Sequence, residues 1–259
     1  MGERKNPSLP LVESYPLLKE VIQDGRQPNH IFIIPDGNGR WAKKAYGMDT
    51  IPFFGHKAGA QRVKNILRDL RELPIGFVTL WGFSADNWKR DDDEVGALMN
   101  LFKNMVKENL KELKENNVRF MHLGRKDRIP GGLLEVLSSA EDQTMANNGQ
   151  VLSLGIDFGG EDQTVRMINK AIQLFPQNQI SLETMKRLRD GNGFVPSADL
   201  IIRTSGEYRL SDVGWLNGAK TEIYVTNKLL PDMTTKDIID AIVDYARREK
   251  RLGGRPVLT

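Results

Sequence analysis

The segment His30–Pro35 reads HIFIIP, and Asp36–Trp41 follows it directly with the sequence DGNGRW. A short run dominated by aliphatic and aromatic residues is typical of a strand that is buried on both faces. The glycines and polar residues behind it let the backbone turn tightly and favour the start of a helix. Together the two segments predict a buried strand whose carboxyl end opens into a polar turn.

Comparable apolar runs recur farther along the chain, at Phe77–Phe83, Val118–Leu123, Val151–Phe158, Asp199–Thr204 and, less clearly, Glu222–Thr226. Apolar residues spaced three or four positions apart predict helices around Val63–Leu70, Val95–Leu113 and Ile238–Ala246. Strands that alternate with helices are typical of an α/β fold. We expect a mostly parallel central sheet of about six strands flanked by helices.

The domain organisation is expected to be simple. No internal repeat or low-complexity linker divides the chain, so residues 30–259 are predicted to form a single domain. Residues 1–29 are polar and interrupted by prolines, and we expect them to form a loose N-terminal arm with one short helix.

The composition excludes several kinds of chemistry. The 259 residues include no cysteine, which excludes a disulfide framework, a thiolate metal site and a cysteine nucleophile. Three histidines leave little room for a His-rich metal site.

Charge and hydropathy give weaker indications. The 37 basic and 34 acidic side chains leave a formal charge of +3, which is too small to indicate a nucleic-acid partner but suits an anionic substrate or a membrane surface. No apolar run approaches the ~18–20 residues of a membrane span. The opening sequence MGERKNPSLPLVESYP lacks the apolar core of a signal peptide, so a cytoplasmic location is expected.

Polar side chains gather where the predicted strands end. Asp36–Trp41 follows the first strand, Ser84–Arg90 the second, and the sequence RTSGEYRLS, from Arg203 onward, ends the fifth. Ligands of open parallel sheets bind beyond the carboxyl ends of the strands. We therefore expect these segments to meet in one site.

The segment Asp36–Trp41 suits an anion. Gly37 and Gly39 allow a ligand to approach the backbone, Arg40 offers a charged clamp, and the N–H groups at the start of a helix attract phosphate. Asp36 could hold a divalent cation that bridges phosphate oxygens. The alternative is a plain strand-to-helix turn in which Asp36 caps the helix.

Two nucleotide motifs are weak or missing. The sequence GNGRWA fits a loose dinucleotide fingerprint, but no acidic residue ends a second strand at the required distance behind it. The glycine-rich loop of nucleotide triphosphatases is absent.

The next two segments each allow two interpretations. Gly55–Gly59, with His56 inside it, suits a phosphate or is a helix start with an exposed lysine. The segment Ser84–Arg90 offers Ser84 and Asn87 as hydrogen-bonding groups, Trp88 as an apolar wall and Arg90 as an anion contact. The acidic run Asp91–Glu94 that follows is interpreted as the start of a long helix rather than as a metal cluster.

The fifth strand leads to Arg203, Arg209 and Ser211, whose two guanidinium groups and hydroxyl suit a diphosphate. Glu222 could join Asp36 on a metal ion or simply lie on an edge strand. All these groups together indicate a polyanion, most simply a diphosphate with Mg²⁺. The apolar stripe Val95–Leu113 could line a tunnel for a hydrocarbon tail, although core packing explains most of its residues.

The motifs HIFIIPDGNGRWA, GHKAG, FSADNWKR and RTSGEYRLS, with Glu222 and the sequence RLGG beyond them, stand in the order found in the cis-prenyltransferases. Residues 29–256 resemble this family, and in particular its undecaprenyl diphosphate synthase type. The resemblance implies a Mg²⁺-dependent enzyme that adds isopentenyl diphosphate to an allylic diphosphate such as farnesyl diphosphate, with a new cis double bond each cycle. It also implies a homodimer, and membrane contact through the lipid product.

The resemblance assigns a role to each motif residue. Asp36 would be the catalytic Mg²⁺ ligand, and Asn87, in a flexible loop with Ser84, Trp88 and Arg90, a proton acceptor. The allylic substrate would be surrounded by Gly37, Asn38, Gly39, Arg40, Trp41 and His56. Isopentenyl diphosphate would be bound by Arg203, Arg209 and Ser211, and Glu222 would be the second Mg²⁺ ligand.

The chain departs from the family pattern at Pro35, Pro52, Asp86, Glu161 and Tyr208, and its segment Lys43–Phe54 is longer than usual. Two alternatives therefore stay open. One is a short-chain or irregular prenyl-coupling enzyme on the same fold, and the other is a non-catalytic partner subunit.

Overall fold

The computed structural model describes residues 10–47, 53–177 and 179–249. In this part of the chain a sheet of six parallel strands has the order β3-β4-β2-β1-β5-β6. The strands are β1 (His30–Ile34), β2 (Phe77–Ser84), β3 (Arg119–Leu123), β4 (Val151–Phe158), β5 (Ala198–Arg203) and β6 (Asn217–Val225). The expected α/β fold and its six strands are confirmed.

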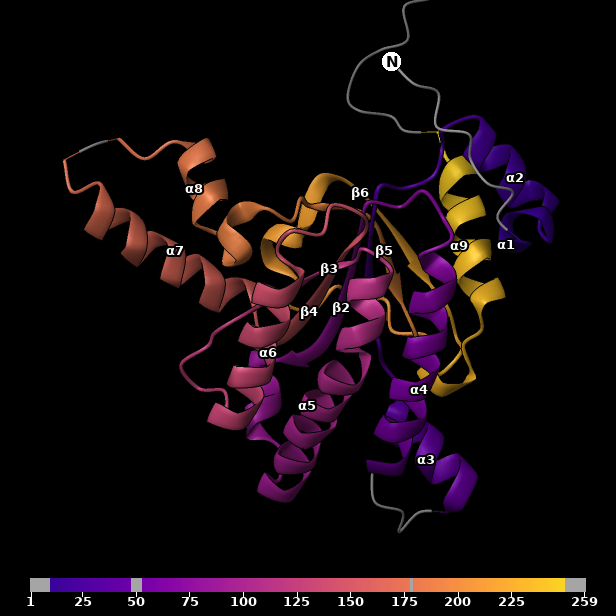
Figure 1. Ribbon diagram of the computed structural model, residues 1–259, viewed down its shortest axis with the longest axis horizontal. Coiled ribbons are helices and arrows are strands. Elements are labelled where there is room, and N and C mark those ends of the chain that lie inside the picture. The colour runs from indigo at the N-terminus through magenta and orange to yellow at the C-terminus, as the bar shows by residue number, and fades with distance from the viewer. Residues whose placement is uncertain (1–9, 48–52, 178, 250–259) are drawn as a thin grey trace, which may run out of the picture.

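Nine α-helices accompany the sheet in the described residues (Figure 1). They are α1 (Pro10–Glu13), α2 (Pro16–Gln23), α3 (Asn38–Tyr46), α4 (Phe53–Leu70), α5 (Asp92–Glu115), α6 (Gly131–Thr144), α7 (Gly160–Leu174), α8 (Leu182–Leu188) and α9 (Thr235–Arg247). Figure 1 shows α7 and α8 extending away from the sheet on one side and α9 with α2 on the other. Helices α3, α4, α5 and α9 were predicted from the sequence, whereas no helix was predicted at α6, α7 or α8.

Strand β1 lies at the centre and carries core residues on both faces. Ile31 and Ile33 belong to the larger hydrophobic core, which α2, α4, α5, α6 and α9 complete. Phe32 and Ile34 belong to a smaller core on the opposite face. Strands β2 and β5 flank β1 and run parallel to it, so the residues that follow these three strands in the sequence lie at the same edge of the sheet.

The N-terminal segment differs from the expected loose arm with one short helix. Its described part forms two helices, and Leu18 and Val21 of α2 are buried in the larger core. Pro10 and Pro16 each stand at the first position of a helix, where the missing N–H has no partner to lose. Two of the prolines that suggested a broken arm, Pro10 and Pro16, therefore start helices.

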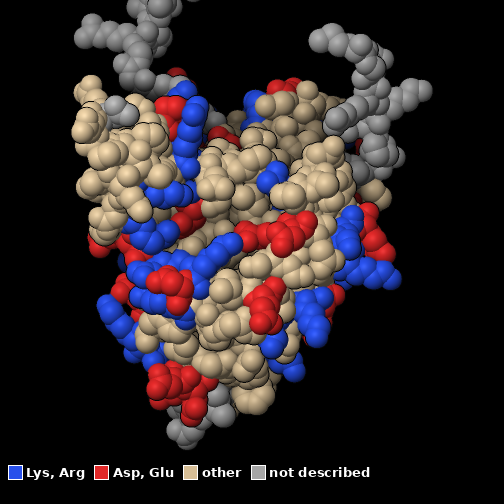
Figure 2. Space-filling model, turned by 60° about the vertical axis from the view of Figure 1, so that its left-hand side comes forward, with Lys and Arg blue, Asp and Glu red and all other residues tan. Residues whose placement is uncertain are grey.

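Strand β6 is one of the two edge strands, and it is the one strand of the six in the described sheet that has no buried residue. This exposure explains why its apolar pattern was the least clear in the sequence. On the face shown in Figure 2, basic and acidic side chains are interspersed, as the nearly balanced composition requires. None of the helices in the described part of the chain combines the length and the apolar character that a bilayer crossing requires.

His30, the first residue of β1, is completely buried. Its Nδ1 lies 3.0 Å from the carbonyl oxygen of Pro196, and its Nε2 lies 2.8 Å from the Thr79 hydroxyl. Burial lowers the pKa of His30 to about 4, because the charged imidazolium would lose its hydration. The ring is therefore neutral in the folded protein at neutral pH.

We expect the free energy of unfolding to fall as the pH drops from about 6.5 towards 4, because the unfolded chain takes up a proton that folded His30 does not accept. The difference between the two pKa values corresponds to about 3 kcal/mol when the titration is complete. Urea unfolding at several pH values measures this loss. In His30→Gln, the free energy of unfolding should depend less steeply on pH between pH 6.5 and 5. Equal slopes in the two proteins would contradict the assignment.

Candidate active site

A cavity of about 610 Å³ opens where β1, β2 and β5 end. Nine of the residues singled out in the sequence line it, and they come from four separate segments: Asp36, Asn38, His56, Ser84, Asn87, Arg90, Arg203, Arg209 and Ser211. The expectation that the strand ends meet is therefore confirmed for these side chains.

Asp36 is held in place through its backbone. The Thr204 hydroxyl accepts the Asp36 N–H at 2.6 Å and donates to the Asp36 carbonyl oxygen at 2.7 Å. The Leu230 N–H donates to the same carbonyl oxygen. These backbone hydrogen bonds therefore fix the position of Asp36 just beyond the end of β1 without using its carboxylate.

The Asp36 carboxylate lies between two arginines. Arg203 approaches one oxygen to 3.2 Å, and Arg40 approaches the other to 3.3 Å. Partial burial by itself would raise the pKa of Asp36, but hydrogen bonds from Arg203 and from the Gly37 N–H, with the charge of Arg40, keep this pKa below its ordinary value. Asp36 is therefore a carboxylate at neutral pH.

Arg203 is almost completely buried, with 4% of its surface exposed. Besides Asp36, its guanidinium donates to the Ser211 hydroxyl at 2.9 Å and to the Arg209 carbonyl oxygen. Its Nε is buried and has no acceptor among the described residues. A buried cationic N–H without a partner suits an anionic ligand.

A second group of contacts connects α3, α4 and α5. His56 lies 3.4 Å from the Asn38 amide on one side and 3.4 Å from the Glu94 carboxylate on the other. Arg90 donates to the same Glu94 oxygen at 2.9 Å. Burial, followed by the charge of Arg90, lowers the pKa of His56, so its imidazole is neutral at neutral pH.

Glu94 was missed as a site residue, because the acidic run Asp91–Glu94 was interpreted only as the start of a helix. That interpretation is correct: Asp91 caps α5 by accepting the Asp93 N–H. Glu94 is four positions behind Arg90, a spacing that brings two side chains together at the start of a helix, and this was the available signal.

The segment Ser84–Arg90 is folded on itself. The Asn87 side chain accepts the Ser84 N–H at 2.9 Å, which closes a short 3₁₀ turn. Trp88 does not line the cavity: its ring packs edge-on against Phe83, with the ring centres 5.1 Å apart. Asp86 lines the cavity and pairs with Lys89.

The rest of the Asp36–Trp41 segment supports the site from behind. Gly37 caps α3 with a φ of 98°, and a side chain there would meet Leu229 at 2.7 Å. Arg40 donates to the Ser205 hydroxyl and pairs with Glu207. Trp41 donates to Asp232. The alternative in which Asp36 caps the helix is wrong, since Gly37 occupies that position.

Glu222 is separate from Asp36 within this chain. It lies on β6 beside Leu200 and accepts a hydrogen bond from Arg248 at 2.8 Å, and it is not among the residues that line the cavity. Of the unusual positions, Pro35 and Glu161 line the cavity, whereas Tyr208 is 82% exposed and lies elsewhere. Pro52 is outside the described residues.

The donor set allows one kind of metal site. The described residues contain no group of three or more His, Asp or Glu side chains arranged to hold a metal ion. Asp36 offers a single carboxylate beside groups that suit phosphate. This fits Mg²⁺, which is commonly bound by one or two carboxylates together with substrate phosphates and water.

The deeper wall of the cavity is apolar. It is formed by α4, α5 and β2 with the side chains Val63, Leu80, Leu98, Leu101, Phe102 and Met105. Part of the stripe Val95–Leu113 therefore faces the cavity. Val95, Met99 and Leu113 do not line this cavity but belong to the larger hydrophobic core.

Residues 34–253 match the family model described as "Putative undecaprenyl diphosphate synthase". The chain belongs to this family. An isoprenyl transferase of Treponema denticola is 40% identical over 86% of this chain and 96% of its own length, and one of Clostridium acetobutylicum is 36% identical over 88% and 90%. The resemblance to the cis-prenyltransferases is thereby confirmed, and the chain is an enzyme of this class.

Two solved structures of the cis-prenyltransferase fold are similar to the chain. Lavandulyl diphosphate synthase from Lavandula x intermedia, in complex with dimethylallyl diphosphate, has a TM-score of 0.82 and 31% identity over 89% of this chain and 100% of its own. A probable undecaprenyl diphosphate synthase from Campylobacter jejuni has a TM-score of 0.72 at 23% identity, over 88% and 99%. The second likeness concerns the fold alone.

Proposed function

We propose that the enzyme condenses isopentenyl diphosphate onto an allylic prenyl diphosphate with formation of a cis double bond, and that repeated cycles give a polyprenyl diphosphate for use as a lipid-carrier precursor. The observation that carries this proposal is the position of Asp36 and Arg203 at the mouth of a cavity whose inner wall is apolar. A diphosphate head and a hydrocarbon tail need these two surfaces side by side.

The allylic diphosphate is placed at the start of α3. The N–H groups in its first turn and the positive end of the helix dipole favour an anion there. His56, whose ring lies 3.4 Å from the Asn38 amide, and Arg90 line the same cavity. Arg203, with its unpartnered Nε, and Arg209 and Ser211 bind isopentenyl diphosphate. The two reacting carbons thus meet between the two phosphate sites, where orientation alone accelerates a reaction.

Asp36 would hold the Mg²⁺, which would supply positive charge to a departing diphosphate. The arginines beside it bind the diphosphate more strongly as its charge grows. Phe102, Leu80 and the other apolar side chains keep water from the carbocation. Asn87, at the rim, is the group that we place nearest the proton lost when the double bond forms.

A specific observation favours one alternative. The likeness to lavandulyl diphosphate synthase keeps a short-chain or irregular coupling reaction as the second candidate. Incubation of the purified enzyme and Mg²⁺ with radiolabelled isopentenyl diphosphate and dimethylallyl, farnesyl or geranylgeranyl diphosphate separates the two. A series of products longer than the primer supports elongation, and a single coupled product supports the alternative. No product with any primer would contradict both and favour a non-catalytic partner subunit.

We infer that Glu222 acts at the site of a second copy of the chain. It lies on the exposed edge strand and outside its own Asp36 cavity, and α7 carries the exposed apolar residues Val165, Ile168 and Ile172, as a homodimer contact would. In an isologous dimer, Asp36 of one subunit would then share a site with Glu222 of the other.

Co-expression of Asp36→Ala and Glu222→Ala subunits tests this arrangement. Each homodimer should be nearly inactive, but a mixed dimer should contain one complete site, so random pairing should restore about a quarter of the sites. If Glu222 acts within its own chain, the mixture should be no more active than the two variants alone. Sedimentation of the wild-type enzyme checks the dimer itself.

Peripheral membrane contact also remains part of the proposal. The exposed aromatic residues Tyr46 and Phe54 lie beside Lys43 and Lys44 at the end of α3, a combination that suits an anionic lipid surface. Co-sedimentation with anionic vesicles, compared with neutral ones, measures it, and equal binding to both would contradict a role for the lysines.

A further inference from the structure

The first turn of α7 is capped by a residue from a distant segment of the chain. Gly159, at the N-cap position of α7, has no side chain that could accept the free N–H groups of this turn. Asp212 accepts two of them instead. Its carbonyl oxygen accepts the Gly160 N–H at 3.0 Å, and its two carboxylate oxygens lie 3.0 Å and 3.2 Å from the Glu161 nitrogen.

The turn that contains Asp212 lies very close to the backbone of α7. A Cβ atom on Gly160 would lie 2.2 Å from the Cα atom of Gly214. A Cβ atom on Gly159 would lie 2.8 Å from a carboxylate oxygen of Asp212. The side chain of Val213 is buried in the smaller hydrophobic core. The turn is therefore fixed at two points, by this core and by the start of α7.

The contact with α7 bears directly on Ser211, the residue before Asp212. Ser211 has a φ of 55°, in the left-handed region that residues with a side chain rarely adopt, so the surrounding structure must hold it there. In this conformation the Ser211 hydroxyl accepts a hydrogen bond of 2.9 Å from Arg203, and Ser211 lines the cavity together with Arg209. The direction of the hydroxyl therefore depends on how the next residue is held.

A carboxylate is an unexpected group in this part of a cavity that suits anions. Asp212 lines the cavity, and its negative charge would repel a diphosphate. Partial burial raises the pKa of Asp212, and the nearby carboxylates of Glu161 and Asp86 raise it further. The charge is thus unfavourable at this position. The useful feature of the side chain is its acceptor oxygen, which an amide would supply equally well.

We propose that Asp212 is a positioning residue of the isopentenyl diphosphate pocket, and that it keeps the Ser211 hydroxyl in place by joining the segment behind β5 to the first turn of α7. The inference rests on the proposed function and adds a residue that acts on one of the two substrates. The allylic diphosphate is placed at the start of α3, on other segments, so its binding should not depend on Asp212.

The first test is the kinetics of Asp212→Ala, with initial rates measured over a range of each substrate in turn. KM for isopentenyl diphosphate should rise about five- to tenfold, as expected when one hydrogen bond to the substrate is lost. KM for farnesyl diphosphate should stay within about twofold of the wild type, and kcat should fall by less. A general loss of structure would change both KM values together.

Two further variants separate the geometry of the contact from its charge. Asp212→Asn keeps an oxygen that can accept the Glu161 N–H, so its KM for isopentenyl diphosphate should stay close to that of the wild type. Gly159→Ala keeps the carboxylate but places a Cβ atom against it. Because a side-chain carboxylate can turn aside, this variant should fold, and its KM for isopentenyl diphosphate should rise as in Asp212→Ala.

A double variant tests whether Asp212 acts through Ser211. Once the hydroxyl has been removed by Ser211→Ala, the addition of Asp212→Ala should raise KM for isopentenyl diphosphate no further. If the effect of the double variant equals the product of the two single effects, the two residues act independently and the proposal is wrong.

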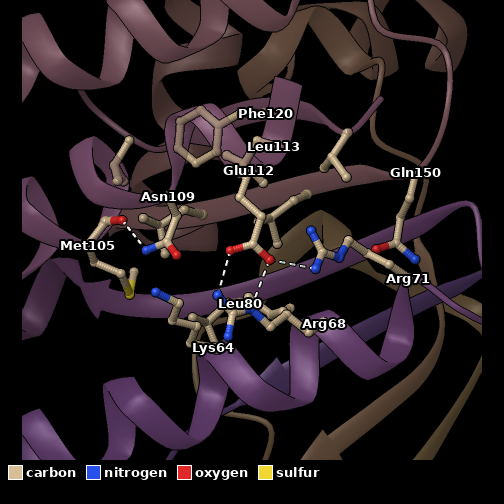
Figure 3. A pocket seen from close by; sticks show the side chains of 15 residues that line it. Lys64, Arg68, Arg71, Leu80, Met105, Asn109, Glu112, Leu113, Phe120 and Gln150 are labelled. Carbon is tan, nitrogen blue, oxygen red and sulfur yellow. Dashed lines mark hydrogen bonds and ion pairs between the residues drawn. The ribbon is translucent and has the colours of Figure 1, made fainter. Parts of the chain in front are cut away.

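The cluster around Glu112 provides a control for lost stability (Figure 3). Glu112 of α5 accepts hydrogen bonds of 2.8 Å and 2.7 Å from Arg68 and one of 2.6 Å from Arg71, and it does not line the active-site cavity. Glu112→Ala should therefore lower the temperature of thermal unfolding and leave KM for isopentenyl diphosphate unchanged. A rise in this KM would show that the measurement reports stability alone.

The outcomes distinguish the positioning role from the proposed function. If the wild type elongates and KM for isopentenyl diphosphate is unchanged in both Asp212→Ala and Gly159→Ala, the positioning role is overturned and the proposed function stands. The role is also overturned if Asp212→Asn is as impaired as Asp212→Ala. No product from the wild type with any primer would overturn the proposed function and the inference with it.

Discussion

Asp36→Ala is expected to lower turnover by about 10²- to 10³-fold or more, the loss typical of removing one preorganised electrostatic group from an active site. In the proposed reaction this carboxylate would hold the Mg²⁺ whose positive charge would offset that of the departing diphosphate. The fold should survive, because Thr204 and Leu230 hold the backbone of Asp36 and do not use its side chain. Steady-state turnover at saturating substrates and thermal unfolding measure the two effects separately.

Glu207→Gln is a suitable control for this variant. Glu207 also pairs with Arg40 and lies close by, but it does not line the cavity. Its loss should change turnover by only a few-fold, as is usual for partly exposed ion pairs. If Asp36→Ala were as active as Glu207→Gln, the assignment of Asp36 to the reaction would be wrong.

Arg203→Ala is expected to reduce kcat/KM for isopentenyl diphosphate by about 10- to 100-fold, which corresponds to the loss of one or more charge-assisted hydrogen bonds. Both constants should change. KM should rise because the buried guanidinium is lost, and kcat should fall because Asp36 loses a partner at 3.2 Å. Initial rates over a range of isopentenyl diphosphate concentrations give the two values.

Arg209 provides the comparison, since its side chain is 62% exposed and, among the described residues, forms an ion pair only with Glu207. Arg209→Ala should raise KM with little change in kcat. Arg203→Lys should recover binding in part but not kcat, because an ammonium group cannot hold Asp36, Ser211 and the Arg209 carbonyl together. Unchanged kinetics in Arg203→Ala would remove this arginine from the substrate site.

The sequence predicted the sheet well because buried parallel strands leave a direct mark. Five of the six strands are largely apolar and buried, and the segments that follow β1, β2 and β5 meet as the topology of such sheets requires. The edge strand β6 gave a poor signal because half-exposed strands need fewer apolar residues. Helices α6 and α7 were not predicted, because each buries only one narrow face and so gives a weak apolar pattern in the sequence.

The details of the site depend on the directions of side chains, which the pattern of apolar and polar residues in the sequence does not specify. Trp41 and Trp88 lie in the correct segments but point towards Asp232 and Phe83, because the rotation of each turn is set by packing. Thr204, which anchors Asp36, and Glu94, which holds His56, were missed for the same reason: both act through contacts across 38 residues or more. In the proposed dimer, the position of Glu222 relative to Asp36 depends on how two subunits pair, which no sequence pattern of one chain specifies.

The central place of β1 has a consequence for biosynthesis. The strand that carries Asp36 begins at residue 30, but its neighbour β5 begins at residue 198. The Thr204 hydroxyl that fixes Asp36 is therefore synthesised 168 residues after it. Until β5 has been synthesised, the nascent chain holds a strongly apolar ribbon with one open edge, and this intermediate is where a chaperone would be needed most.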